Sequence, residues 1–221
     1  MISNATLSFL KELKTNNDRD WFNENKKRFK EAEAEAKDAG NTLFGMMKTH
    51  DAVDKVKLFR IYRDVRFSAN KQPYKTHFGI SFRRQKPEYR GGYYLHVEPG
   101  NSFIATGFWQ PEKDDLLRIR KEFEMDDTEM REIINDKTFQ SVWGEVKGEE
   151  VKTAPKGFSK DHPAIDLIRK KQYMFTKNFT DKEVLSKDFL EKADQSFRTI
   201  RPYFDYMSEV LTTDLNGVSV I

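Results

Sequence analysis

Three short segments in the middle of the chain alternate apolar and polar side chains, with turn residues between them. They are HFGISFRR (77–84), YYLHVEP (93–99) and SFIATGFW (102–109), joined by QKPEYRGG and EPGN. This alternation is typical of strands with one buried face, and such short turns join antiparallel neighbours. VKLFRIYR (56–63) has the character of a further strand. The middle third therefore predicts an antiparallel meander near 77–109.

Alternation also assigns the two faces of the predicted sheet, because successive side chains of a strand point to opposite sides. The predicted core face comprises Phe78, Ile80, Phe82, Tyr93, Leu95, Val97, Phe103, Ala105 and Trp109. The other face mixes small and polar groups, which can form the bottom of a pocket. Its residues are His77, Gly79, Ser81, Arg83, Tyr94, His96, Glu98, Ser102, Ile104, Thr106 and Phe108.

Helical periodicity flanks these strands on both sides. Residues 6–17 predict a short helix, residues 18–47 a long one with a small-residue stripe, and residues 187–213 a last one. The stripe is Ala32, Ala36 and Ala39, which suits close packing against another element. No linker, repeat or low-complexity segment interrupts the chain. We expect one α+β domain over residues 1–221, with a central antiparallel sheet packed by the N- and C-terminal helices.

Composition excludes several classes of protein. The chain has no cysteine, which removes disulfides, a thiol nucleophile and cysteine-based zinc sites. Charged residues make up 34% and the mean hydropathy is −0.80, and no apolar run approaches the ~20 residues of a membrane span. The N-terminus lacks the pattern of a signal peptide. We predict a cytoplasmic protein with no membrane partner.

Positive charge is concentrated in RIYRDVRFSANKQPYKTHFG (60–79). Residues 55–90 hold eleven basic and two acidic residues, a net charge of +9, whereas residues 101–136 hold five basic and ten acidic residues, a net charge of −5. The three arginines of the first segment recur every third residue, so they converge only if the strand bulges or ends near Arg63. The guanidinium group of arginine has five N–H donors in a geometry that matches a carboxylate or a phosphate. The predicted ligand-binding residues are Arg60, Arg63, Asp64, Arg66, Lys71, Tyr74 and Tyr94.

Two acid–imidazole pairs are candidates for proton transfer. His96 and Glu98 lie two apart on a predicted strand and share a face, and Asp161 precedes His162 directly. These four are the predicted catalytic residues, since histidine titrates near neutral pH. P-loop, Rossmann, nucleophile-elbow, HExxH and EF-hand motifs are absent.

A mononuclear metal site from His77, His96, Glu98 and His162 is an alternative reading of the histidines. These residues do not form a known metal-binding motif, so we predict no metal ligand and make no prediction of a cofactor. The favoured reading is that the histidines belong to a hydrogen-bonded polar network.

The charged segment also resembles a family signature. Arg60-x-x-Arg63-Asp64-x-Arg66-Phe67-x-x-Asn70-Lys71-x-x-Tyr74 is similar to that of a bacterial, and in part fungal, family of conserved proteins of unknown function, in which Asp or Asn precedes the lysine. Similar segments elsewhere are Phe9-Leu10-x-x-Leu13-x-x-Asn16-Asn17, Trp21-Phe22, Lys26, Tyr93 to Gly100, Gly107-x-Trp109-x-Pro111, Pro155-x-Gly157-Phe158 and Asp161-His162-Pro163. The resemblance implies a single domain of about this length. It implies no reaction, substrate or cofactor.

Three functions remain open at this point. The favoured one is an enzyme or binding protein for a small anionic molecule, such as a phosphorylated metabolite or nucleotide, held in an Arg/Lys-rich pocket. The second is a nucleic-acid-binding module, because aromatic residues lie between the basic ones. The third is a structural or protein-interaction role, with the arginines in internal salt bridges. The sequence does not decide between an enzyme and a binding protein and indicates no oligomeric state.

Overall fold

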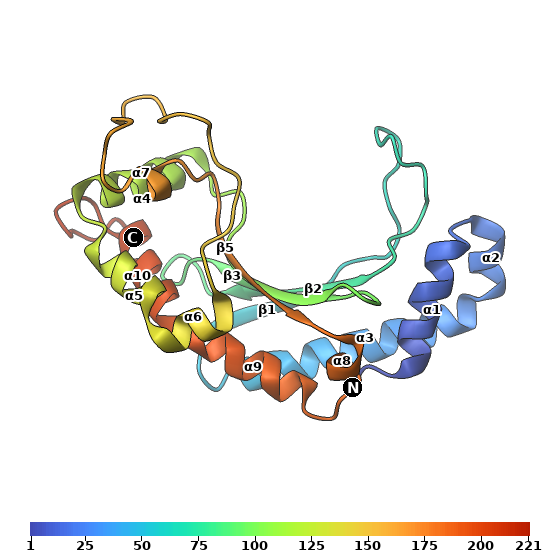
Figure 1. The fold of residues 1–221 in the computed structure, drawn as a ribbon. Helices are drawn as coiled ribbons and strands as arrows, with labels where there is room; N and C mark the ends of the chain where they lie inside the picture. The colour runs from blue at the N-terminus through green and yellow to red at the C-terminus, as the bar shows by residue number, and fades with distance from the viewer. The chain divides into compact units, whose positions relative to one another are not determined.

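The computed structural model describes residues 1–221 and has an α+β fold (Figure 1). Five strands form one antiparallel sheet in the order β1-β2-β3-β4-β5. Their bounds are β1 (Val53–Leu58), β2 (Phe78–Arg84), β3 (Gly92–Val97), β4 (Ser102–Phe108) and β5 (Tyr173–Phe179). The predicted fold class and the meander of β2, β3 and β4 are confirmed.

Helices precede and follow the meander. They are α1 (Asn4–Thr15), α2 (Arg19–Glu24), α3 (Lys26–Met47), α4 (Lys113–Met125), α5 (Thr128–Asn135), α6 (Lys137–Trp143), α7 (Ile165–Ile168), α8 (Asp181–Val184), α9 (Phe189–Thr199) and α10 (Arg201–Thr212). None of them combines the length and the apolar composition that a membrane crossing requires.

The chain divides into two compact units. Unit 1 comprises Met1–Phe82, Tyr94–Ile104 and Asn178–Gln195, and unit 2 comprises Arg83–Tyr93, Ala105–Lys177 and Ser196–Ile221. Strands β2 to β5 each contribute residues to both units. The expectation of one domain over residues 1–221 stays a prediction.

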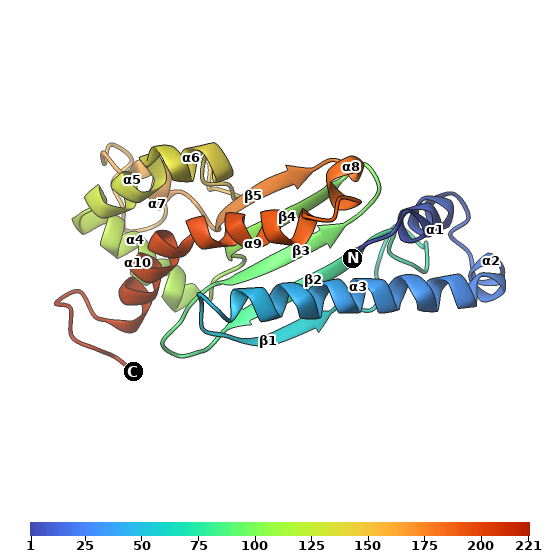
Figure 2. The same cartoon turned by 90° about the horizontal axis from the view of Figure 1, so that it is seen from below.

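In unit 1, α3 packs against the sheet through its small residues. Figures 1 and 2 show α3 running beside β1 and β2. Ala32, Ala36, Ala39 and Gly40 are buried, and a Cβ added to Gly40 would lie 3.1 Å from the Ile80 side chain. The expected close packing of the small stripe is therefore confirmed, and Gly40 extends it by one residue.

Two predicted helices are each divided by a sharp turn. Residues 18–47 form α2 and α3, which meet at Asn25, whose amide donates to the Trp21 carbonyl at 2.9 Å. The turn allows Phe22 and Phe29 to bury against each other, with ring centroids 5.0 Å apart. Residues 187–213 form α9 and α10 on either side of Ile200. Pro202 lies in the first turn of α10, where its missing N–H costs little.

The predicted strand over residues 56–63 is wrong beyond Leu58, where β1 ends. Residues 59–77, here called the arm, leave the sheet (Figure 1). The arm returns on itself through one isolated bridge, Tyr62 to Tyr74, and the Arg63 N–H donates to the Pro73 carbonyl at 2.9 Å. The strand ends at Leu58, five residues before Arg63, so the convergence of the three arginines stays a prediction. The strand ends early because both tyrosines pack against helices instead of continuing the sheet.

The predicted faces of β4 are reversed. Ser102, Ile104, Thr106 and Phe108 are the buried residues of β4, whereas Phe103 is half-buried. The Ser102 hydroxyl donates to the Glu98 carbonyl at 2.9 Å, and this turn sets the register of β4 against β3. Since β4 has large apolar residues on both faces, alternation alone could not decide between the two registers.

In unit 2 a buried arginine stabilises α10. Arg84 is fully buried and donates to the Arg90 carbonyl at 2.9 Å and to the Ser208 hydroxyl at 3.1 Å. Its guanidinium lies over the Phe204 ring at 4.7 Å. These contacts offset the cost of removing the charge from water.

Candidate functional site

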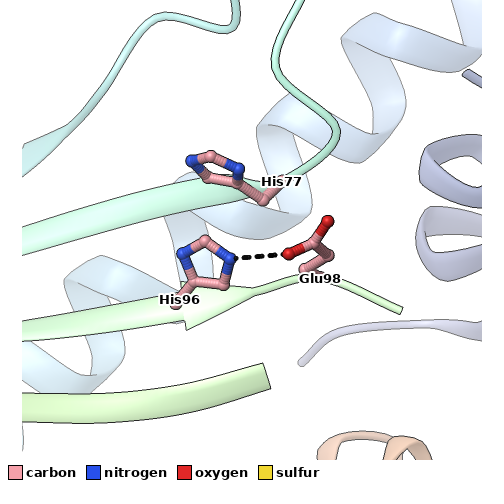
Figure 3. Close-up of side chains that lie close together, drawn as sticks. All are labelled: His77, His96 and Glu98. Carbon is pink, nitrogen blue, oxygen red and sulfur yellow. Dashed lines mark hydrogen bonds and ion pairs between the residues drawn. The ribbon is translucent and has the colours of Figure 1, made fainter. Parts of the chain in front are cut away.

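Three chemically active side chains of unit 1 meet at one end of β2 and β3. His77 directly precedes β2, His96 lies in β3, and Glu98 follows the last residue of β3. One ligand-type atom from each of the three lies within 4.8 Å of the other two (Figure 3). Because α3 covers the face that bears Ile80, alternation places this cluster on the opposite face of the sheet.

A chain of hydrogen bonds orients His96. Its Nε2 lies 3.1 Å from Glu98 Oε2, and its Nδ1 lies 3.3 Å from the Tyr94 hydroxyl. With Glu98 ionised, the carboxylate favours a proton on Nε2, so the Tyr94 hydroxyl donates to Nδ1. The side chains of His96 and Glu98 are only 9% and 13% exposed, which keeps this chain largely out of water.

Several groups hold the Glu98 carboxylate in place. The Thr76 hydroxyl donates to Oε1 at 3.0 Å, and the Asn101 amide donates to Oε2 at 2.9 Å. Lys14 of α1 forms an ion pair with Oε1 at 4.0 Å. Glu98 is therefore fixed from the arm, from the β3–β4 turn and from α1.

Burial and hydrogen bonds shift the pKa values of the cluster. Burial, reinforced by the nearby His96, lowers the pKa of His77 to about 4. Burial also lowers the pKa of His96, against the opposing effect of Glu98. Burial tends to raise the pKa of Glu98, but hydrogen bonds from Asn101, His96 and Thr76 outweigh it and lower the pKa. At neutral pH the cluster is two neutral imidazoles beside one carboxylate.

Aromatic contacts fix the planes of the imidazole rings. The centroids of His77 and His96 are 4.1 Å apart, and Phe103 stacks on the other side of His96 at 4.5 Å with an interplanar angle of 12°. Neither ring nitrogen of His77 is a buried unsatisfied atom, so the nitrogens of this half-buried ring face solvent. The neutral His77 ring therefore offers one nitrogen lone pair and one N–H group to a ligand beside Glu98.

A group of cations lies where the arm leaves the sheet. The ammonium groups of Lys57 and Lys75 lie over the Phe59 ring, at 5.2 and 5.5 Å from its centroid. Burial and the charges of Arg60 and Arg63 lower the pKa of Lys75, so these cations are near one another. Phe59 also contacts Tyr94, with ring centroids 6.3 Å apart. The cations thus adjoin the face that carries His96.

The charged side chains at the tip of the arm form hydrogen bonds and ion pairs with other residues of the arm. Arg66 pairs with Asp64 through two hydrogen bonds of 3.0 and 2.7 Å. Lys71 donates to the Val65 carbonyl at 3.1 Å, and Arg63 donates to the Gln72 carbonyl at 3.1 Å. Arg60, by contrast, is exposed, and Asp64 pairs with Arg66 instead; the pKa of Asp64 is lowered mainly by its hydrogen bonds with Arg66 and to a smaller degree by the Arg60 charge. The ligand-binding roles predicted for Asp64, Arg66 and Lys71 stay predictions.

Tyr74 anchors the base of the arm to the N-terminal helices. Its ring is buried and stacks on Phe22 with centroids 3.9 Å apart. Asn17 makes two hydrogen bonds to the Tyr74 backbone, accepting from its N–H at 3.1 Å and donating to its carbonyl at 3.0 Å. Lys26 donates to the Tyr62 hydroxyl at 2.6 Å. Packing alone therefore accounts for Tyr74, and its predicted contact with a ligand stays a prediction.

Asp161 and His162 belong to unit 2, in the segment between α6 and α7. Asp161 is exposed and His162 is half-buried. His162 Nδ1 accepts a hydrogen bond from the Ala164 N–H at 3.1 Å, which is a local turn contact. The catalytic roles predicted for these two residues stay predictions.

Sequence reasoning missed several residues of the site. Thr76 and Asn101 were not proposed, although each lies at the end of a loop that reaches Glu98. Phe103 stacks on His96 but was assigned to the core face, because alternation alone did not reveal which face of β4 is buried. Lys75 was counted in the basic segment but not in the site. Its position two residues before His77 was the available signal.

A separate groove in unit 1 contains none of the predicted site residues. It has a volume of about 640 Å³ and lies between α3 and β1, where its lining includes Lys30, Glu33, Lys37 and Val56. The basic and acidic groups at its rim belong to a solvated helix face, so it adds no chemistry to the His77–His96–Glu98 cluster.

Comparison with known proteins identifies the family. The sequence profile of a family described as conserved hypothetical protein (DUF2461) matches residues 5–206. The chain belongs to the DUF2461 family. No curated protein and no solved structure matches the chain.

Membership of DUF2461 confirms the expected family of unknown function. The match includes the arm and the complete His77–His96–Glu98 cluster, because both lie within residues 5–206. The arginine signature and the bacterial and fungal range stay predictions. The DUF2461 description names no reaction, so a function has to be argued from the site.

Proposed function

We propose that this protein binds a small anionic molecule, such as a phosphorylated metabolite, beside the Tyr94–His96–Glu98 face of unit 1. The cations that would hold the anion are Arg60 and Lys75, while Arg63, hydrogen-bonded within the arm, adds its charge nearby. The single observation that carries the proposal is that these cations gather at the base of the arm with no carboxylate paired to Arg60 or Lys75.

Electrostatics supports a ligand at this place. Like charges held close together repel, and part of the Lys75 ammonium is removed from water. An anion bound between the cations would relieve this repulsion through charge-assisted hydrogen bonds, which are about twice as strong as neutral ones. The arm tip differs because Asp64 already neutralises Arg66.

The same geometry favours a ligand-binding site over a simple charged surface. Phe59 links the cations to Tyr94, and Tyr94 is hydrogen-bonded to His96. An anion held by Arg60 and Lys75 would therefore lie near oriented imidazole and carboxylate groups. This arrangement suits either an enzyme or a binding protein. His96 and Glu98 keep their predicted catalytic role, whereas Asp161 and His162 are not needed.

Calorimetric titration with inorganic phosphate and pyrophosphate tests the proposal. We expect saturable binding to the unmodified protein. Arg60→Ala and Lys75→Ala should each weaken it by about tenfold or more, because a hydrogen bond to a charged group contributes ~1.5–3 kcal/mol.

Arg66→Ala provides the matched control, since Arg66 belongs to the same arm but is paired with Asp64. This variant should bind pyrophosphate as the unmodified protein does. No saturable binding of either anion, or an equal loss in Arg66→Ala and Arg60→Ala, contradicts the proposed site.

A further inference from the structure

We propose that His77, His96 and Glu98 bind a divalent transition-metal ion of the Zn²⁺, Fe²⁺ or Co²⁺ class. The proposal goes beyond the anion site and does not depend on it. Two imidazoles and one carboxylate form a ligand set typical of such ions, and the remaining coordination positions stay open for water or a ligand.

The positions of the ligand atoms fit one ion after small side-chain adjustments. The three atoms lie within 4.8 Å of one another, whereas ligands of one tetrahedral zinc ion lie about 3.4 Å apart. Side-chain rotations that move the ligand atoms by about one ångström close this difference. Figure 3 shows His77 lying over His96, with Glu98 at the same end of the two rings.

The groups around the ligands are already those of a metal site. Metal-bound histidines commonly have their other nitrogen hydrogen-bonded, and metal-bound carboxylates are hydrogen-bonded as well. When an ion binds, the His96 proton moves from Nε2 to Nδ1, where the Tyr94 hydroxyl can accept it in a hydrogen bond, and Nε2 becomes free for the ion on the side of Glu98. Thr76 and Asn101 orient the Glu98 carboxylate.

His77 is the observation that separates a metal site from a hydrogen-bonded pair. It is half-buried, its ring is tilted by 32° against that of His96 at a centroid distance of 4.1 Å, and it takes no part in the hydrogen bonds between His96 and Glu98. Neither nitrogen is a fully buried unsatisfied atom, so the ring is open to a ligand from solvent. A metal ion shared with His96 and Glu98 would satisfy a His77 nitrogen directly.

Hard ions are a poorer fit. Mg²⁺ and Ca²⁺ prefer six or more oxygen ligands, and this cluster supplies only one carboxylate beside two imidazoles. Imidazole suits zinc, iron, cobalt and nickel better. Co²⁺ is therefore the appropriate probe, because its visible absorption reports the ligands and the coordination number.

The test is a Co²⁺ titration of the full chain after treatment with a chelator, followed by visible absorption and calorimetry. We expect one ion per chain with absorption bands typical of nitrogen and oxygen ligands. His77→Ala and Glu98→Gln should each weaken Co²⁺ binding by about tenfold to a hundredfold or more. Thermal unfolding with and without Co²⁺ shows whether each variant is folded, and His77→Ala and Glu98→Gln should gain less stability from the ion than the unmodified protein.

Matched controls separate this cluster from general metal binding by the surface. Glu24→Gln changes an exposed carboxylate of α2, and His162→Ala removes a histidine of unit 2. Both variants should bind Co²⁺ as the unmodified protein does. The proposal is overturned if the unmodified protein binds no stoichiometric Co²⁺, or if folded His77→Ala and Glu98→Gln bind it equally well. A loss in His162→Ala as large as in His77→Ala overturns the three-residue ligand set.

Phosphate binding by the chelator-treated protein distinguishes this inference from the proposed anion site. Phosphate binding without Co²⁺ binding overturns the metal site alone. Co²⁺ binding without phosphate binding contradicts the anion site alone.

Discussion

Gly79 shows how the absence of one side chain shapes the candidate site. A Cβ at this position would clash with the Tyr94 hydroxyl and would lie 3.0 Å from Tyr94 Cζ. That hydroxyl is the group that contacts His96 Nδ1. Gly79 is therefore required by the ring of Tyr94 and not by an unusual backbone conformation.

We expect Gly79→Ala to lower the free energy of unfolding by about 1–3 kcal/mol, the usual cost of overpacking. Tyr94→Phe removes the atom closest to the new methyl group, so the double variant should lose less than the sum of the two single variants. Urea unfolding of the four proteins measures this coupling. Strict additivity would show that the two side chains do not meet.

At the residue scale, the sequence predicted the shared face of His96 and Glu98 because that follows from strand alternation. It did not predict that His77 would stack on His96 or that Asn101 would hold Glu98. The first contact depends on the register of β2 against β3, and the second lies within the turn between β3 and β4.

At the scale of elements, α3 contains two glycines in contrasting places. A Cβ on Gly40 would lie 3.1 and 3.3 Å from atoms of Ile80 and 3.7 Å from Val56, whereas a Cβ on Gly45 would meet nothing within 4 Å. The same substitution at the two sites therefore separates packing against the sheet from intrinsic helix propensity.

Gly40→Val should lower the free energy of unfolding by about 1–3 kcal/mol, because the added atoms force α3 away from Ile80. Gly45→Val is the matched control and should be neutral or stabilising by a few tenths of a kcal/mol, because valine is a better helix former than glycine. Chemical denaturation of both variants measures the difference. Equal effects at the two positions would contradict the packing of α3 through its small residues.

The elements themselves were predictable to different degrees. The stripe of Ala32, Ala36 and Ala39 predicted the buried face of α3, because period 3.6 is a direct consequence of helix geometry. The arm was not predictable from its pattern. Residues 59–63 alternate like a strand, but Tyr62 and Tyr74 gain more by packing against Phe22 than by continuing β1. Such tertiary preferences override local propensity.

At the scale of the whole molecule, charge is separated along the chain while the net charge is only +3. Residues 55–90 carry +9, but Arg66 is neutralised by Asp64, and the segment 101–136 carries −5. Nucleic-acid binding needs many phosphate contacts at once, and its affinity falls steeply as salt displaces them. A few cations at the base of the arm can instead hold one small anion.

We therefore expect no mobility shift of single-stranded DNA or RNA at about 0.15 M salt, where exposed charges are screened beyond roughly 8 Å. Pyrophosphate binding should persist under the same conditions, because Arg60 and Lys75 act at contact distance. Phe67 is 98% exposed at the tip of the arm, so Phe67→Ala is the informative variant. A shift that survives at this salt and is lost in Phe67→Ala would indicate base stacking on the arm, and the nucleic-acid reading would then replace the small-anion site.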